Sequence, residues 1–313
     1  MNTRDIPVTL FWPIHCCDKR VQQSFLETIA ESGADGLNFN PPEMEAMMAH
    51  PGEILRWKKM LAGAGTKFLD GHNPFGPLED LNCPVPELRP HMLAMHRRCL
   101  ALCAEFGVKS TTIHVGRPTE YCKDADVSHE NLLRSLEQLL PAAEEFGVVV
   151  CIENIWDPTN TAGRLLDAIE RFKSPWLGIC WDSGHAQLSR SDSPDTPEQC
   201  CRTSWKNNGF PAGPAEWSDT GEYLRRLQPH IVTCHLHTND RVRDRHWLPT
   251  DPRGKTDWAA EMPLLLQAPR LMQLQNEASP NAENPFTPRH SFESVRAIAE
   301  IGRAAIAAGA ANP

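Results

Sequence analysis

Residues 149–158, VVCIENIWDP, and residues 177–186, LGICWDSGHA, form the stretch that indicates the fold. Each part begins with an apolar run that ends in a carboxylate, Glu153 in the first and Asp182 in the second. A continuous run rich in Val, Ile and Cys is typical of a parallel strand covered on both faces, and the helix-length segment Thr161–Lys173 separates the two runs. We therefore predict a βαβ unit with an acid at the carboxyl end of each strand, where barrels built from such units carry their active sites.

The same alternation of a short apolar run and a helix-length segment extends along the chain. Strands are predicted at Val8–Trp12, Asp35–Phe39, Thr66–Asp70, Ser110–Val115, Val148–Ile152, Trp176–Trp181, Ile231–His237 and Leu271–Glu277. Eight strand–helix pairs are typical of a (β/α)8 TIM barrel, an α/β fold, and 313 residues suit one such domain with insertions. We predict a single domain over residues 1–313, with one continuous helix over residues 41–61.

Residues 189–214 interrupt this alternation. The segment is rich in Ser, Asp, Pro, Gly and Asn and shows no hydrophobic period. We predict a loop inserted after the sixth strand. Such a loop either covers the active-site face of the barrel or is a solvated excursion, and the sequence favours neither interpretation.

The composition limits the classes of partner. No segment reaches the roughly 18 apolar residues that cross a bilayer, and the N-terminus lacks the apolar run of a signal peptide, so we expect a cytoplasmic protein without a membrane partner. The net charge of −9, from 31 basic and 40 acidic residues, disfavours nucleic acid as a partner, because phosphate contacts need Lys and Arg. The 11 cysteines form no CxxC pair, and we expect Cys151 and Cys180 to pack as reduced thiols.

Polar residues collect at the predicted strand ends. They are His72, His114, Glu153, Asp182 with His185, His235 with His237, and Glu277. A single histidine at such a position is more often a hydrogen-bonded core residue than a ligand, but several unpaired carboxylates buried together would cost several kcal/mol each unless cations offset their charge. We therefore predict a divalent metal site. Mixed His and carboxylate ligands suit Mn²⁺, Zn²⁺, Co²⁺ or Fe²⁺ better than Ca²⁺, and the number of ions stays open.

Six motifs resemble those of the xylose isomerase-like TIM barrels, a family that holds sugar isomerases and epimerases, inosose-type dehydratases and isomerases, and endonuclease IV. The motifs are HNPFGPLEDLN at 72–82, TIHVG at 112–116, VCIEN at 150–154, WDSGHA at 181–186, HLHTNDRVRDRHWLP at 235–249 and QNEAS at 275–279. The resemblance covers nearly the whole chain. WDSGHA and the HxHxND…DxH block are its specific parts.

The resemblance implies that one metal is held by Glu153, Asp182, His237 and Glu277. His237 is preferred to His235 because the Asn-Asp pair of the motif follows it, although the two histidines face the same side of a strand. The multi-zinc members carry further ligands at positions that match His72, His114, His185, Asp244 and His246. Isomerase-like members also carry the DxH block and use these groups to bind substrate hydroxyls, so the full set does not fix the number of metals.

The function that this resemblance implies is a metal-dependent isomerase or epimerase of a sugar or related polyol. Glu153 and Glu277 would move a proton through a metal-stabilised enediolate, and His185 and Arg243 would position the substrate oxygens. The chain departs from the family where WLPTDPRGKTDW replaces a Gly-rich turn. This change introduces Arg253. Its side chain either binds an acidic substrate or lies in the loop without a role in binding.

Three alternatives remain open from the sequence. Dehydration of a cyclitol or keto acid begins with the same proton abstraction. A phosphoesterase of the endonuclease IV type would use the full ligand set, and the acidic net charge opposes it. A barrel that binds a sugar or metal without turnover predicts a missing ligand, and none is missing. The expected partner is a small-molecule sugar or polyol, and formation of a homo-oligomer stays open.

Overall fold

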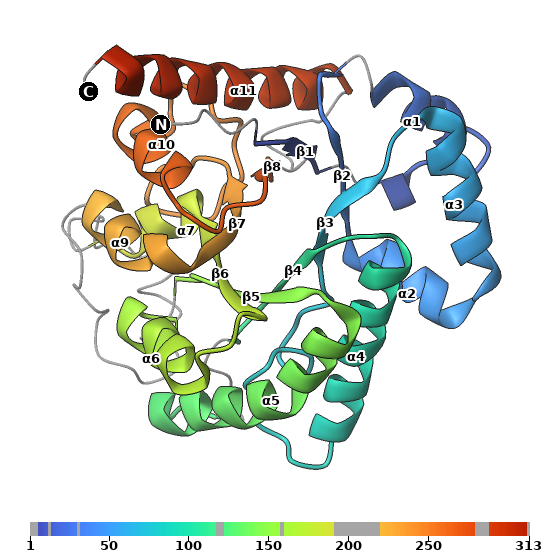
Figure 1. The fold of residues 1–313 in the computed structure, drawn as a ribbon, viewed down its shortest axis with the longest axis vertical. Coiled ribbons are helices and arrows are strands. Elements are labelled where there is room, and N and C mark those ends of the chain that lie inside the picture. The colour runs from blue at the N-terminus through green and yellow to red at the C-terminus, as the bar shows by residue number, and fades with distance from the viewer. Residues whose placement is uncertain are drawn as a thin grey trace.

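A computed structural model describes residues 6–11, 14–29, 32–116, 122–156, 160–190, 220–278 and 288–311. Parallel strands close into a barrel in chain order, β1 to β8, and helices surround it (Figure 1). The strands are β1 Val8–Leu10, β2 Gly36–Phe39, β3 Phe68–His72, β4 Ser110–Ile113, β5 Val149–Glu153, β6 Leu177–Asp182, β7 Ile231–Leu236 and β8 Leu274–Asn276. The predicted (β/α)8 TIM barrel is therefore confirmed.

The helices occupy the outer layer. They are α1 Gln22–Ile29, α2 Pro41–Ala49, α3 Gly52–Ala64, α4 Arg89–Glu105, α5 Ala125–Phe146, α6 Ala162–Phe172, α7 Ser183–Leu188, α9 Thr220–Leu227, α10 Trp258–Leu266 and α11 Pro288–Ala311, with 3-10 turns at Ile14–Cys16 and Gln228–His230. In Figure 1 the closing helix α11 lies beside α10. Residues 191–214 of the predicted inserted loop lie outside the described residues, and the domain limits of 1–313 stay a prediction. No described helix has the length and apolar character needed to cross a membrane.

The structure corrects the prediction of one helix over residues 41–61. The chain forms two helices there, and they meet at His50 and Pro51. A residue before proline is pushed out of the helical region, and His50 accordingly has φ −136° and ψ 89°. Helix α2 therefore ends at Ala49. Its first turn follows directly after the carboxyl end of β2.

A polar layer fills the barrel interior below the strand ends. Asp70 is fully buried and accepts hydrogen bonds from the hydroxyls of Ser110 at 2.8 Å and Thr233 at 2.5 Å. Gln273 donates to the same two hydroxyls at 2.8 and 3.0 Å. Bulky branched residues usually occupy these layers in TIM barrels. Here the hydrogen bonds tie β3, β4, β7 and β8 together beneath the rim that carries the predicted site.

The cysteines inside the barrel are reduced and buried. Cys151 and Cys180 pack with Val149 and Val232 in a small apolar cluster. Burial raises the pKa of both thiols well above the ordinary value, so both stay protonated at neutral pH. The Cys180 sulfur also lies near Glu153 and His235, where a bound metal would have to displace the thiol proton before the sulfur could be a ligand. These contacts agree with the predicted packing role.

Replacement of Cys151 by alanine should therefore affect stability and not the metal. Cys151→Ala removes a fully buried sulfur, and we expect the free energy of unfolding to fall by about 1–2 kcal/mol. Metal content should stay unchanged. Urea unfolding and elemental analysis check this, with Cys122→Ala, a half-buried position outside the barrel, as the control. Loss of metal in Cys151→Ala would show that the thiol belongs to the site.

Candidate metal centre

The parallel barrel brings the predicted polar residues to one rim. His72, Glu153 and Asp182 end β3, β5 and β6. The first residues after β4, β7 and β8 are His114, His237 and Glu277, and His235 lies within β7. The side chains of all these residues are at most 13% exposed. Because every strand points the same way, their carboxyl ends meet, and the predicted set becomes one cluster.

The first potential metal group contains three carboxylates and one imidazole. One ligand atom from each of Glu153, Asp182, His235 and Glu277 lies within 4.8 Å of the others. The Nδ1 atom of His235 is 3.1 Å from Glu153 Oε1, 3.1 Å from Glu277 Oε2 and 3.8 Å from Asp182 Oδ2. His237, the histidine expected from the family motif, contacts only Asp182 in this group, at 3.0 Å from Nε2 to Oδ2.

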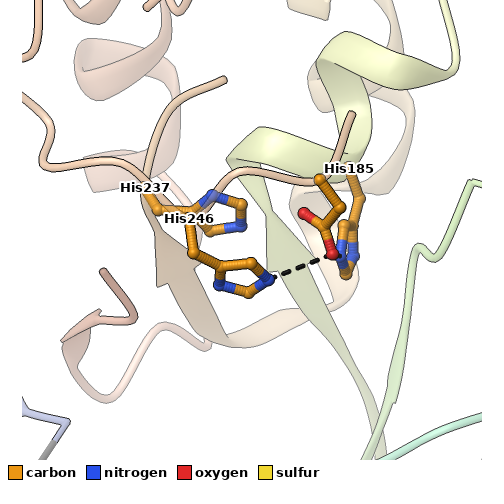
Figure 2. A group of neighbouring side chains, drawn as sticks. His185, His237 and His246 are labelled. Atoms are coloured by element: carbon orange, nitrogen blue, oxygen red, sulfur yellow. Dashed lines mark hydrogen bonds and ion pairs between the residues drawn. The ribbon is translucent and has the colours of Figure 1, made fainter. Parts of the chain in front are cut away.

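The second potential metal group contains His185, His237, Asp244 and His246. The Nε2 atoms of His185 and His246 lie 3.3 and 3.1 Å from Asp244 Oδ2, and the ring of His237 stacks on that of His246 with centroids 4.0 Å apart. Figure 2 shows the three imidazoles gathered together, with a dashed line on the bond between His246 and Asp244. Three imidazoles and a carboxylate suit Zn²⁺.

A third group joins His72 and His114 to Glu153. His114 Nε2 lies 3.0 Å from Glu153 Oε2, and this glutamate belongs to three of the potential metal groups among the described residues. The Nδ1–H of His72 donates to the carbonyl oxygen of Asn73 at 2.9 Å, which leaves Nε2 as the acceptor. Burial, with the nearby charge of His114, lowers the pKa of His72 to about 4. A neutral imidazole with a fixed tautomer is what metal ligation requires.

A buried network holds Asn73 in place behind His72. Its side-chain amide donates to Nδ1 of His96 at 3.0 Å, and Thr111 Oγ1 donates to its carbonyl oxygen at 2.7 Å. The Nε2–H of His96 in turn donates to the backbone carbonyl of Glu79 at 2.7 Å. His96 is fully buried, and burial lowers its pKa to about 4. The network therefore depends on a neutral His96.

We expect His96 to make stability depend on pH. Below the ordinary pKa of 6.5, the unfolded chain binds a proton that folded His96 rejects down to about pH 4. As the pH is lowered through this window, the free energy of unfolding should fall by about 1.4 kcal/mol per pH unit because of His96. His96→Gln should show a slope that is shallower by that amount, measured by urea unfolding at a series of pH values. Equal slopes in both proteins would contradict the assignment.

The loop after β7, which carries Asp244 and His246, contains two strained backbone positions. His246 has φ 47° and Arg241 has φ 65°, values that non-glycine residues seldom adopt. An antiparallel bridge between Thr238 and Trp247 closes the loop, and Nδ1–H of His246 donates to the carbonyl oxygen of Glu277 at 3.0 Å. These contacts offset the strain, which costs about 1–3 kcal/mol per residue, and aim Nε2 of His246 at Asp244.

Charge pairing decides the protonation of the cluster. Burial alone would raise the pKa of Glu153, but the charges of His235 and His114 hold it well below the ordinary value. Burial would lower the pKa of His246, but Asp244 raises it to about 10. The carboxylates are therefore ionised at neutral pH. A metal that binds the imidazoles must displace their protons.

Two buried polar atoms of the described cluster, His237 Nδ1 and Asp244 Oδ1, have no hydrogen-bond partner. Three more have only a close ion-pair contact: Glu153 Oε2 with His114 at 3.0 Å, His185 Nδ1 with Glu153 at 3.3 Å, and Glu277 Oε2 with His235 at 3.1 Å. Each such atom costs about 1–3 kcal/mol when it is left unsatisfied. All five belong to residues of the predicted ligand set. The donor types and these unsatisfied atoms therefore fit divalent cations.

A cavity of about 570 Å³ opens above the cluster. The lining residues that belong to the potential metal groups, which we call the metal-side residues, are His72, His114, Glu153, His185, Asp244, His246 and Glu277. Asp182, His235 and His237 are fully buried and are not part of this lining. Neither predicted arginine is among the described lining residues. Arg243 is exposed. Arg253 pairs with Asp251 at 2.8 Å and lies 4.0 Å over the ring of Trp247. Substrate binding by these two arginines stays a prediction.

The sequence model of the xylose isomerase-like TIM barrel family matches residues 26–269 of this chain. The chain belongs to this family. Its barrel is similar to that of a D-tagatose 3-epimerase-like protein, with a TM-score of 0.71, 17% identity, and coverage of 96% of this chain and 98% of that one. It is also similar to 3-keto-D-glucoside 4-epimerase, YcjR, from E. coli in its apo form, with a TM-score of 0.67, 16% identity, and coverage of 95% and 100%.

A curated sequence relative is an uncharacterized protein, y4fM, of Sinorhizobium fredii. It is 25% identical over 276 residues, which are 80% of this chain and 78% of the relative. Because the two solved structures are only 17% and 16% identical to this chain, their similarity to it shows the fold alone. The function of this xylose isomerase-like barrel must therefore be argued from its own residues.

Two residues that support the candidate centre were not predicted. The Ser183 hydroxyl donates to the carbonyl oxygen of His237 at 2.7 Å and accepts from its N–H at 3.1 Å. Gly184 lies so close to His237 that a Cβ atom would be 2.0 Å from ring atom Cε1. Both residues belong to the WDSGHA motif of the family, which was the available signal. This motif therefore fixes His237 as well as supplying Asp182 and His185.

Proposed function

We propose that this protein is a divalent-metal-dependent isomerase or epimerase of a sugar or related polyol. One observation carries the proposal: Glu153 and Glu277, which both contact Nδ1 of His235 at 3.1 Å, line the same cavity. Two carboxylates at one space can serve as base and acid for a proton on a substrate carbon. The fold shared with a D-tagatose 3-epimerase-like protein and with a 3-keto-D-glucoside 4-epimerase supports it.

The proposed metal ligands are Glu153, Asp182 and Glu277 with a histidine of β7. His235 is the histidine that joins this group, whereas the family motif favours His237. A divalent metal, when bound, supplies positive charge that stabilises the enediolate formed on proton removal. The remaining groups, His72, His114, His185, Asp244 and His246, would bind substrate oxygens or further ions.

The proton transfer would fall to the two glutamates. Burial would raise the pKa of Glu277, but the charge of His235 lowers it, as for Glu153. Both are therefore carboxylates at neutral pH, and either can accept the proton next to the substrate carbonyl. Return of the proton to the opposite face gives an epimer, and return to the neighbouring carbon gives an isomer. His185, which lines the cavity, would orient a substrate oxygen.

A product screen tests this proposal. Protein loaded with Mn²⁺ or Co²⁺ is incubated with a panel of ketoses and inososes, and the products are separated by chromatography. At least one substrate should give an epimer or isomer of equal mass, and a chelator should stop the reaction. A product lighter by one water would instead indicate dehydration of a cyclitol or keto acid. No product of either kind, in metal-loaded protein, would contradict the proposal.

The second candidate is a phosphoesterase of the endonuclease IV type. It is favoured by the several potential metal groups among the described residues, of which three contain Glu153. The net charge of −9 opposes it, because binding to a phosphate backbone needs a basic face. We expect no incision of an abasic-site duplex at low salt with Zn²⁺ or Mn²⁺. Incision at enzyme-like rates that is lost in His246→Ala would favour the phosphoesterase.

A further inference from the structure

The cavity above the candidate metal centre extends well beyond it. Besides the metal-side residues, its lining includes Phe11 after β1, His15, and Asn40 and Glu45 at the start of α2. A hexose fills roughly 200 Å³ if each non-hydrogen atom takes about half the 30 Å³ of a liquid water molecule. A cavity of about 570 Å³ therefore has room for two such units. The far end can hold a part of the substrate that does not react.

The far end of the cavity is polar. His15 and Glu45 offer a hydrogen-bond donor and a carboxylate acceptor, and Asn40 adds an amide whose oxygen accepts from Asn38 at 3.0 Å. Adjacent hydroxyls of a sugar both donate and accept, so a donor next to a carboxylate is the complement they need. These residues come from the segment after β1 and from the β2–α2 junction. These two strands complete the barrel between β8 and β3, and their ends supply none of the metal-side groups.

A buried carboxylate fixes His15 at this end. Glu43 is only 3% exposed, and neither of its oxygens has a hydrogen-bond partner. Its Oε1 lies 3.7 Å from Nδ1 of His15, whose pKa this contact raises. A buried carboxylate is costly without a nearby cation. The His15 ring is therefore held over Glu43 while 41% of its side chain stays exposed.

Aromatic rings lie beside the metal-side histidines, where a sugar ring could stack. The ring of Phe75 stacks on His114 at 4.3 Å between centroids and is 47% exposed. Trp156 contacts the edge of His185 at 4.7 Å. Both line the cavity, and prolines 41 and 42 continue the apolar wall toward His15. The cavity lining thus combines the metal-side groups, the polar residues His15, Asn40 and Glu45, and apolar side chains.

We propose that His15, Asn40 and Glu45 form a second sugar subsite, and that the substrate is a ketose linked to a second polyhydroxylated unit. This inference rests on the proposed function. The linked unit would bind at the far end through its hydroxyls, and the ketose would lie against Glu153 and Glu277, which line the cavity. A free monosaccharide would leave the far end filled with water.

Calorimetry on Mn²⁺-loaded protein tests this proposal. The probes are D-fructose, the keto-disaccharides isomaltulose and lactulose, and p-nitrophenyl β-D-glucoside. At least one keto-disaccharide should bind at least tenfold more tightly than D-fructose. His15→Ala and Glu45→Gln should each reduce this ratio severalfold, whereas Glu130→Gln, an exposed position on α5 outside the cavity lining, should keep it.

The outcomes separate this inference from the proposed function. If D-fructose or another free ketose is epimerised and the keto-disaccharides bind no more tightly than D-fructose, the second subsite is wrong and the proposed function stands. A ratio that survives both His15→Ala and Glu45→Gln would also overturn the subsite. Tighter binding of p-nitrophenyl β-D-glucoside than of either keto-disaccharide would assign the far end to an apolar group instead. If no sugar binds or reacts, both proposals fail.

Discussion

Glu153→Gln is expected to lower turnover by about a thousandfold while the protein stays folded. Glu153 lies 3.0 Å from His114, 3.1 Å from His235 and 3.3 Å from His185. Its negative charge therefore interacts with three histidines of the cluster. The amide keeps the shape of the side chain but can neither accept the substrate proton nor supply an anionic ligand. The loss is within the range of about 10²–10⁴ for an acid–base group. Turnover, metal content and urea unfolding with a chelator present measure the effect.

The matched control for this prediction is Glu130→Gln. It makes the same chemical change at an exposed position on α5 and should leave turnover and metal content unchanged. The free energy of unfolding of metal-free Glu153→Gln should stay within about 1 kcal/mol of the wild type, because its packing is intact. Wild-type turnover and metal content in Glu153→Gln would remove this residue from the site.

Gly184→Ala should damage the second metal group without changing a ligand. The added Cβ would lie 2.0 Å from Cε1 and 2.5 Å from Nδ1 of His237, so the imidazole must move. His237 stacks on His246, and the displacement would spread through the group. We expect the affinity for Zn²⁺ to fall about 100-fold, the upper end of the range for residues that orient metal ligands. Calorimetric titration with Zn²⁺ measures this.

Gly163→Ala is the control for this steric argument. Gly163 lies in α6, where the nearest contact of an added Cβ is 3.9 Å away, at Thr161 Oγ1. This variant should keep its affinity for Zn²⁺ and gain slightly in stability, because alanine is the better helix former. Unchanged Zn²⁺ affinity in Gly184→Ala would mean that His237 is not part of the second group.

The barrel could be predicted because its strands are parallel and covered on both faces. Such strands appear as uninterrupted apolar runs, as at β5 and β6, and acids that follow them must meet at one rim. The break between α2 and α3 was missed although the sequence marks it, because Pro51 and Gly52 form a pair typical of a turn. The short helix α7, residues 183–188, is too brief to show a period.

The residues of the candidate centre could be predicted, but their division into groups could not. A spacing of two at the end of β7 puts His235 deeper than His237, but it does not say which of the two joins which metal group. That depends on the contacts of Ser183 and Gly184, which belong to a neighbouring segment. Likewise, the charge of Arg253 is plain from the sequence, whereas its stacking on Trp247 depends on the loop conformation.

Solvent deuterium exchange tests the central claim most directly. Metal-loaded protein in D₂O should place one deuterium on the carbon next to the carbonyl of at least one ketose or inosose, and a chelator or Glu153→Gln should stop the exchange. Such exchange requires removal of a carbon-bound proton, which sugar isomerisation and epimerisation share and phosphoester hydrolysis lacks. The account predicts exchange without incision of an abasic-site duplex. No exchange across the panel, together with incision that His246→Ala abolishes, would contradict it.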